Sequence, residues 1–268
     1  MALLSTLTSG ISALRAFTTG LDTIGNDIAN VNTTAYKSSD TSFADTFNGV
    51  GVQVTGVNAN FTQGALNSTG VNTDLGISGN GYFMVEDPAT TQQYATRDGQ
   101  FHFDSSGFLV NQQGYQVVGL TGGTSSAAPG TLGPIKQGTL PSGAQLQSVT
   151  VGTSGNLVES YSDGTQVTTN QVLMQNYTDP SQLVSQGNNL YTNLSAAGPL
   201  STTLAASTNT PGGGGLGSIE AGTLEQSNVD LTQEFSNMIT MQRAFEANAR
   251  LVTVSDTILQ SIVNLKQP

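Results

Sequence analysis

Residues 228–265 decide the fold of this chain, and they read NVDLTQEFSNMITMQRAFEANARLVTVSDTILQSIVNL. Apolar side chains recur every three or four residues with no proline or glycine between them, which predicts one long amphipathic helix. Asp230 followed by Gln233 fits a capping box, in which the glutamine reaches back to the start of the helix. At a rise of ~1.5 Å per residue the helix is roughly 54 Å long, and its apolar stripe needs a partner. The stripe includes Leu231, Phe235, Met238, Phe245, Val252 and Ile262.

The start of the chain carries a second helical pattern, between Leu4 and Val31. Its apolar stripe includes Leu7, Ile11, Leu14, Leu21, Ile24 and Ile28. Glycines at positions 10, 20 and 25 weaken this helix, each by ~1 kcal/mol relative to alanine. Because isolated helices depend on tertiary burial, the two stripes indicate a two-helix coiled coil or helices that pack between molecules. A pair of ordinary core helices would give the same periodicity.

The middle of the chain predicts an antiparallel β body. Short alternating runs are separated by turn dipeptides such as Asp98-Gly99 and Asp163-Gly164, which are typical of hairpins. We therefore expect an α+β fold, with long N- and C-terminal helices that pair as a coiled coil around a central all-β body. The expected domains are a helical assembly region at 1–49 and 220–268, and a β-rich body at 50–219. A Gly-rich segment near 198–217 is expected to be a mobile loop or linker.

Two expectations follow, one for the β body and one for the terminal segments. A fragment from about Val50 to Asn193 should fold alone as a β domain. The terminal segments, about 1–35 and 228–268, should order fully only when neighbouring subunits bury their stripes.

Composition excludes several classes of protein. The 268 residues contain no cysteine, so disulfides and thiol catalysis are excluded. Only 9 % of residues are charged, the net charge is −11, and the seven basic residues are scattered, which argues against a nucleic-acid partner. The sequence contains no window of eighteen apolar residues, so we expect no membrane-spanning helix. It also contains no basic segment followed by an apolar run, so we expect no cleavable signal peptide.

No catalytic or cofactor-binding constellation is evident. His102 is the single histidine and lies in an alternating run, where a strand would point it to solvent. A lone histidine without cysteine does not make a zinc site or a triad. The glycines of residues 76–81 lie between β segments, so they indicate turns and not a nucleotide loop. We expect no enzyme activity, no metal and no cofactor.

Five blocks of the sequence resemble the bacterial flagellar rod and hook proteins. Residues 24–37 (IGNDIANVNTTAYK) are similar to the family's N-terminal signature, and residues 222–231 and 238–248 to its C-terminal signature. Residues 78–83 and 97–101 are similar to its β-domain motifs. The matched motif positions are Asn26, Asn30, Asn32, Lys37, Asn228, Asp230, Gln242 and Arg243.

Two positions depart from the family's pattern. Asp27 stands where asparagine is usual, and Ala35 stands where glycine is usual. The second departure would restrict the turn that leaves the helix, because alanine disfavours positive φ.

The resemblance implies a structural subunit of the bacterial flagellum, located in the hook or basal body. Such a chain polymerises with copies of itself into a tubular filament, with its terminal helices in an inner coiled-coil layer. Its other implied partners are neighbouring rod, hook or junction proteins, the cap, and the type III export apparatus, which reads no cleavable signal.

The particular member is a choice between two. Residues 42–47, the short link to Val50, residues 227–231 and the ending at 263–265 resemble hook protein, which we favour. The modest length favours a distal rod protein. A secreted β-rich enzyme or carbohydrate-binding protein with helical ends is a more remote alternative.

Overall fold

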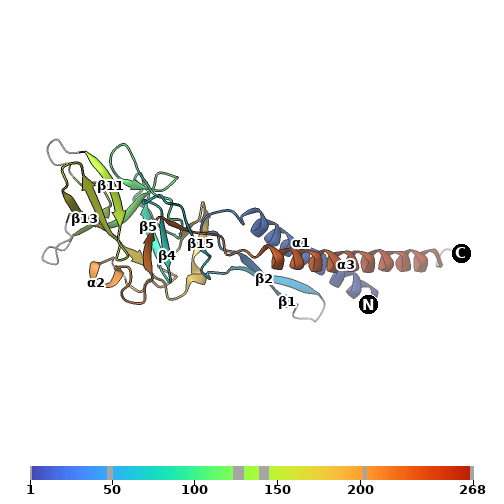
Figure 1. Cartoon of the computed structure of the whole chain (residues 1–268). Helices are drawn as coiled ribbons and strands as arrows, with labels where there is room; N and C mark the ends of the chain where they lie inside the picture. Colours follow the sequence, from blue (N-terminus) through green and yellow to red (C-terminus); the bar gives the residue numbers. More distant parts are fainter. Residues whose placement is uncertain (1, 47–50, 123–129, 139–144, 202–203, 266–268) are drawn as a thin grey trace. The chain divides into compact units, whose positions relative to one another are not determined.

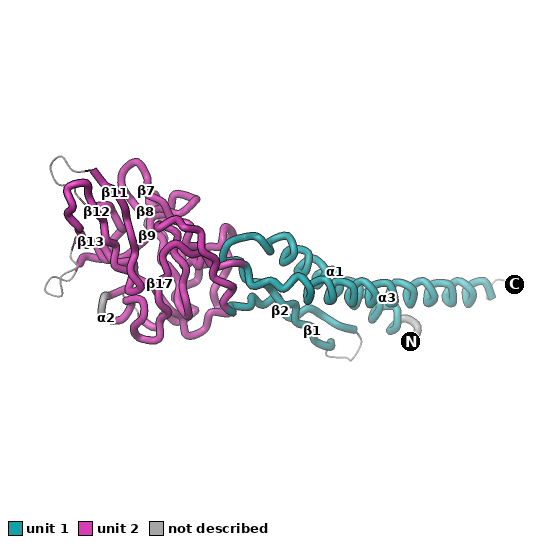
Figure 2. The backbone as a smooth tube through the Cα atoms, viewed as in Figure 1, with its two compact units in different colours: residues 1–62, 227–268 teal, residues 63–226 magenta. Residues whose placement is uncertain are grey.

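The computed structural model describes residues 2–46, 51–122, 130–138, 145–201 and 204–265. The chain divides into two compact units, drawn in different colours in Figure 2. Unit 1 contains residues 1–62 and 227–268, and unit 2 contains residues 63–226.

Unit 1 holds the two long helices. Helix α1 spans Ala2–Ala29 and helix α3 spans Leu231–Leu265, and Figure 1 shows them side by side. They run antiparallel, because Gly10 lies against Val252 while Gly20 lies against Met241. Both predicted helices and the α+β class are therefore confirmed.

The start of α3 is capped by one half of the expected capping box. The Asp230 carboxylate accepts the backbone N–H groups of Thr232 at 2.8 Å and Gln233 at 3.3 Å. This satisfies donors that the first turn of a helix leaves free. The Gln233 side chain does not complete the box, since it donates to Asn237 Oδ1 at 2.9 Å.

A β-hairpin completes unit 1. Strands β1 (Ser39–Asp45) and β2 (Val52–Ala59) pair antiparallel, and both contact α1. The run around Val52 and Val54, which we assigned to the β body, therefore belongs with the helices. For this reason the units divide at 62/63 and 226/227, and not at the expected 49/50 and 219/220.

In its described residues, unit 2 is built on one antiparallel sheet of twelve strands, with the path β11-β12-β13-β9-β5-β6-β16-β15. Strands β10, β14, β7 and β8 pair alongside this path, and two further pairs, β17 with β4 and β18 with β3, form separate small sheets. The strands are β3 (Leu66–Ser68), β4 (Leu75–Ser78), β5 (Tyr82–Glu86), β6 (Gln93–Thr96), β7 (His102–Phe103), β8 (Leu109–Val110), β9 (Gln116–Thr121), β10 (Thr131–Pro134), β11 (Leu146–Val151), β12 (Asn156–Tyr161), β13 (Gln166–Val172), β14 (Met174–Gln175), β15 (Val184–Gly187), β16 (Leu190–Thr192), β17 (Ser218–Ala221) and β18 (Thr223–Glu225). A 3₁₀ turn spans Pro180–Gln182 and a short helix, α2, spans Ala206–Asn209.

The core of unit 2 draws on strands far apart in the chain. Phe83 on β5 is fully buried and meets Phe101 edge to face, with ring centroids 5.2 Å apart. Ile77 on β4 and Ile219 on β17 are also fully buried and oppose each other in the ladder. Residues near 219 are therefore part of the core of the β body.

The Gly-rich segment 198–217 packs onto unit 2 along most of its described length, contrary to our expectation of a mobile linker. Asn209 is 2 % exposed and donates to the Met174 carbonyl at 2.9 Å, and Leu216 belongs to the hydrophobic core. Gly217 passes so close to the Ser78 carbonyl that a Cβ would lie 2.3 Å from its oxygen. The glycine content serves close packing here, while residues 202–203 lie outside the described part of the chain.

Unit 2 should fold alone if it is cut at its own boundaries. We expect fragment 63–226 to show β-type circular dichroism and cooperative thermal unfolding, because it keeps the whole core cluster. The matched fragment 63–193 loses Leu216 and Ile219, and each buried aliphatic side chain is worth ~1.5–3 kcal/mol. It should therefore melt well below the longer fragment. Equal melting temperatures for the two fragments would contradict this description of the core.

Candidate assembly surface

The contact between α1 and α3 depends on small residues of α1. Its buried face includes Gly10, Ala13, Ala16 and Gly20. A Cβ at Gly10 would lie 3.0 Å from Val252 Cγ2, and a Cβ at Gly20 would lie 2.7 Å from Met241 Cε. The two glycines that we expected only to weaken the helix therefore allow α3 to approach closely.

The residues that we predicted as an assembly interface do not share one environment. Ile24 is buried at 7 % exposure. Half-buried positions are Leu7, Leu14, Leu21, Ile28, Met238, Phe245 and Val252. Exposed positions are Ile11, Leu231, Phe235 and Ile262. Each predicted stripe thus lies partly against the other helix and partly on the surface of unit 1.

Helix α3 has a second apolar row, of which the predicted stripe contained only Ile262. Leu251, Val254, Ile258, Ile262 and Leu265 recur every three, four or seven residues, which places them on one side of the helix. Their exposed fractions run from 42 % at Ile258 to 87 % at Leu265. We call these five residues the α3 apolar face. Ile239 and Val263 are exposed elsewhere on the same helix.

The periodicity of the C-terminal half could have revealed this face. Val252, which belongs to the predicted stripe, is half-buried and lies on a different row of the same helix, as does Leu259. Exposed apolar surface of this extent on one element marks an interaction site more often than an ordinary surface.

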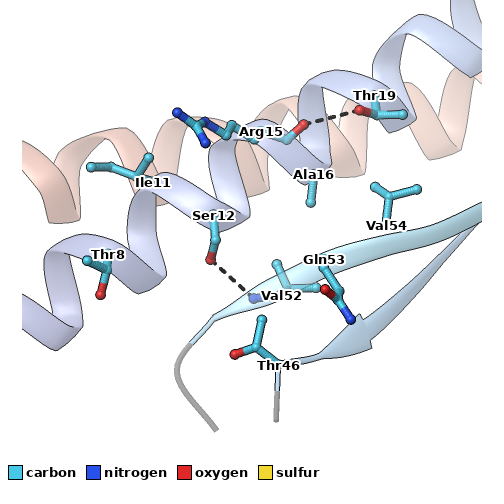
Figure 3. A pocket seen from close by; sticks show the side chains of 10 residues that line it. All are labelled: Thr8, Ile11, Ser12, Arg15, Ala16, Thr19, Thr46, Val52, Gln53 and Val54. Carbon is cyan, nitrogen blue, oxygen red and sulfur yellow. Dashed lines mark hydrogen bonds between the residues drawn. The ribbon is translucent and has the colours of Figure 1, made fainter. Parts of the chain in front are cut away.

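A groove separates α1 from the hairpin of unit 1 (Figure 3). Its volume is about 550 Å³, and its lining is mostly apolar, with Ile11 and Ala16 from the helix and Val54 from β2. At one end Ser12 Oγ accepts the Val52 N–H at 3.2 Å, which fixes the strand to the helix. The groove is a second uncovered apolar surface of unit 1.

A buried carboxyl group joins the end of α1 to the hairpin. Asp27 is 1 % exposed and accepts hydrogen bonds from the Tyr36 hydroxyl and the Ser39 N–H, both at 2.9 Å. Burial raises the pKa of Asp27 above its usual value, and the two hydrogen bonds only partly oppose it. Burial, followed by repulsion from Asp27, likewise raises the pKa of Glu234 on α3. Carboxyl groups thus gather near this end of the helix pair.

The matched family motif positions divide into structural and exposed groups. Asn30 Nδ2 donates to the Asn26 carbonyl at 2.9 Å, and Lys37 Nζ, at 4 % exposure, donates to the Thr62 carbonyl at 2.8 Å. Asn228 and Asp230 also make hydrogen bonds through their side chains. The other motif positions, Asn26, Asn32, Gln242 and Arg243, are exposed, and Asp230 is exposed as well.

Ala35 adopts a positive φ, which is easy for the glycine usual at this position in the family but unfavourable for alanine. Its φ is +56° and its side chain is completely buried. A non-glycine residue in this left-handed region is strained by about 1–2 kcal/mol. The turn after α1 is therefore kept as glycine would form it, at a cost in stability.

The described residues contain no cluster of three or more His, Cys, Asp or Glu side chains that could hold a metal ion. His102 is exposed on β7, as the alternating pattern predicted. Among the described helices, none is sufficiently long and apolar to cross a bilayer. The prominent surfaces of unit 1 are apolar helix faces and a groove.

Comparison with known proteins gives the family. Three family models match: flagella basal body rod protein at residues 7–37, the flagellar hook protein FlgE/F/G D1 domain at 76–159, and the flagellar basal body rod FlgEFG protein C-terminal region at 220–265. The flagellar basal-body rod protein FlgG of Bacillus subtilis is 36 % identical over 286 residues, covering 99 % of this chain and all of the relative. The chain therefore belongs to the flagellar rod and hook protein family.

Two more relatives show the range of that family. FlgG of Borreliella burgdorferi is 30 % identical over 292 residues, covering the whole of this chain and 99 % of the relative. The flagellar hook protein FlgE of Salmonella typhimurium is 25 % identical over 404 residues, covering 96 % of this chain and 98 % of the relative. Rod and hook proteins are structural, so membership supports our expectation that the chain is not an enzyme.

The α1–α3 contact can be tested with two glycines of the same helix. A Cβ at Gly25 would meet nothing within 4 Å, so Gly25→Ala should stabilise unit 1 by the full helix-propensity gain of ~1 kcal/mol. Gly10→Ala should gain less, because its methyl group would press on Val252. Thermal unfolding followed by circular dichroism measures both. An equal gain at the two positions would show that α3 does not approach Gly10 closely.

The buried carboxyl group predicts a pH dependence. The folded chain holds the Asp27 proton more tightly than the unfolded chain, because the folded pKa is raised from 3.8. This contribution to stability is present below the unfolded pKa and is lost as the pH rises through the folded pKa. Asp27→Asn should therefore flatten the fall in the free energy of unfolding above pH 4 and lower the pKa of Glu234.

Asparagine can keep both contacts, accepting from Ser39 and donating to the Tyr36 oxygen. Asp22→Asn, at an exposed position of the same helix, is the matched control. Denaturant unfolding at several pH values, with NMR titration of Glu234, provides the measurement. If both variants keep the pH dependence of the parent chain, Asp27 is not its source.

Proposed function

We propose that this chain is a distal rod subunit of the flagellar basal body, a structural protein that polymerises and transmits torque. The observation that carries the proposal is the α3 apolar face, because Val254, Ile258, Ile262 and Leu265 are exposed in the single chain and Leu251, which also lies against Gly10, is still 44 % exposed. Burying apolar area is the main favourable term in protein association. Because the chain belongs to the flagellar rod and hook protein family, we expect neighbouring copies of the chain to bury the α3 apolar face.

The rod is favoured over the hook by the relatives. Alignments with two FlgG rod proteins run over 286 and 292 residues, close to the 268 of this chain. Alignment with the FlgE hook protein of Salmonella typhimurium runs over 404 residues, so that relative contains long segments that this chain lacks. From the sequence we favoured a hook subunit, whereas the relatives favour the alternative, a distal rod subunit.

A hook subunit is the second candidate, for one specific reason. The hook-like residues 42–47 begin within β1, while residue 47 and the short link to position 50 lie outside the described residues. Hook proteins are also among the relatives that span nearly the whole chain.

The assembly that we propose uses both terminal helices. Helices α1 and α3 would pair as a coiled coil in the inner layer of a tubular filament, with copies of the same chain as principal partners. Neighbouring rod, hook or junction proteins, the cap and the flagellar export apparatus complete the proposed partners. Export would occur through that apparatus, without a cleavable signal peptide.

The pairing of surfaces suits an open polymer. The α3 apolar face and the α1–hairpin groove are different surfaces of one unit. A contact between two different surfaces is heterologous, and it yields a ring or an open helical filament, not a closed dimer. Uncovered apolar rows on α3 together with an uncovered groove therefore support a helical filament of repeated subunits.

Substitutions on α3 should separate assembly from folding. Phe235 is 48 % exposed and Ile258 is 42 % exposed, so changing either to alanine should alter the melting temperature of the single chain little. Each should raise the concentration needed for polymerisation about tenfold or more, because a buried side chain of this size is worth ~1.5–3 kcal/mol. Glu246→Ala, at an exposed charge of the same helix, is the control and should change neither property.

Sedimentation of the polymer and motility in soft agar measure these effects. Phe245→Ala is a useful contrast, because Phe245 is half-buried and its loss should also destabilise unit 1. If Phe235→Ala and Ile258→Ala polymerise at the same protein concentration as the parent chain, α3 is not part of the assembly interface.

Localisation decides between rod and hook. Immunogold electron microscopy of isolated hook–basal bodies should label the rod and not the hook. Label along the curved hook would support the second candidate, and absence from the whole structure would reject both.

A further inference from the structure

The α1–hairpin groove of unit 1 is not filled by any described residue, and six residues of α1 and four of the hairpin line it (Figure 3). Its helix wall carries small side chains at every fourth position, Thr8, Ser12 and Ala16, which form one row along α1. Val54 of β2 lines the groove from the hairpin. A row of small residues leaves a furrow on a helix, into which larger side chains of another helix can pack.

The size of the groove fits side chains of the α3 apolar face. A cavity of ~150 Å³ takes one benzene-sized group, so a volume of about 550 Å³ has room for roughly three aliphatic side chains. Val254, Ile258 and Ile262 recur every four residues and span about 12 Å along α3. The lining residues from Thr8 to Thr19 span about 16 Å along α1, so the groove is long enough for all three.

The charges of the two surfaces are compatible with this contact. Among residues 251–265 the only charged side chain is Asp256, and among the lining residues the only one is Arg15. Asp256 lies two positions from Val254 and so points away from the α3 apolar face, which leaves it in water. Arg15 is exposed and makes no ion pair with another described residue. The single charges are opposite in sign, and neither has to be buried.

The chain's own α3 does not fill this groove, because it packs on a different side of α1. That side contains Gly10 and Gly20, which lie against Val252 and Met241. Positions 10 and 20 are turned away from the row of Thr8, Ser12 and Ala16 by the helical period. An α3 helix that enters the groove therefore comes from a second copy of the chain.

Two copies could instead pair their α3 apolar faces with each other. Such a contact is isologous, and it closes into a two-fold dimer that leaves both grooves open. A contact between the α3 apolar face and the groove is heterologous, so every copy offers one surface of each kind. The contact then repeats from copy to copy, as a filament requires.

We infer that the α3 apolar face of one copy packs into the α1–hairpin groove of the next copy. Val254, Ile258 and Ile262 are the entering side chains, and Ile11 and Val54 receive them on opposite sides of the groove. The inference rests on the proposed function, and it deepens that function by naming the surface that receives α3.

The chain contains no cysteine, so single introduced cysteines can report this contact. Gln53→Cys places a thiol at an exposed lining position of the groove. Val254→Cys, Ile258→Cys and Ile262→Cys place one at each entering position in turn. Each full-length α3 variant is mixed with Gln53→Cys in equal amounts, polymerised and oxidised with copper phenanthroline. A disulfide needs Cα atoms within about 7 Å, so at least one mixture should give a cross-linked dimer that neither variant gives alone.

Matched controls move one thiol away from the proposed contact. Gln260→Cys lies on the opposite side of α3 from Ile258, and Asn58→Cys lies on β2 outside the groove lining. Both positions are exposed, and the cross-link should be lost with either control. Circular dichroism and sedimentation confirm that each variant folds and polymerises. Three entering positions keep the test valid if cysteine at one of them prevents polymerisation.

A polymer in which none of the three mixtures forms a cross-link would overturn the inference, as would equal cross-linking by the controls. Disulfide dimers of the Ile258→Cys variant alone would show that the α3 apolar faces pair with each other instead. These results leave the proposed function intact, because the chain still polymerises. A parent chain that does not polymerise rejects the proposed function, and the inference with it.

Discussion

The close contact of α1 with α3 is the interaction on which unit 1 depends. It brings the two ends of the chain, 1–62 and 227–268, into one unit, and it is possible because Gly10 and Gly20 present no side chain to α3. Leu251 also lies against Gly10, whereas Val254, Ile258, Ile262 and Leu265 stay exposed beside this contact. The same small residues that lower helix propensity thus determine which apolar surface remains open.

Polar side chains fix the turn after α1 and the chain segments between the two units, where apolar packing is sparse. Asp27 fixes the turn after α1 to the hairpin, and Asn228 and Glu225 each bind both stretches of chain that join the units. These side chains are buried or partly buried and accept or donate several bonds, so removing one would leave unpaired groups on several backbones. We propose that the apolar helix rows serve assembly, whereas these polar contacts hold the chain within each unit.

Much of this organisation could be predicted from the sequence, because α3 has an uninterrupted period and Asp230 marks its start. The covered face of α3 could not, since its C-terminal half carries two apolar rows and only the position of α1 selects between them. Residues 211–217 looked like a linker because Leu216 is a lone apolar residue among glycines, yet that leucine is in the core. The pairing of Val52–Ala59 with Ser39–Asp45 was also beyond the local pattern.

Hydrogen exchange of the chain in dilute solution and in the assembled filament tests the account most directly, because it follows α3 residue by residue. The account predicts that amides near the Leu251–Leu265 row exchange quickly in dilute solution and become strongly protected in the filament. Amides of the unit 2 core near Phe83 and Phe101 should be protected equally in both states. Equal exchange across 251–265 in the two states, or new protection confined to unit 2, would contradict the claim that this face of α3 forms the assembly contact.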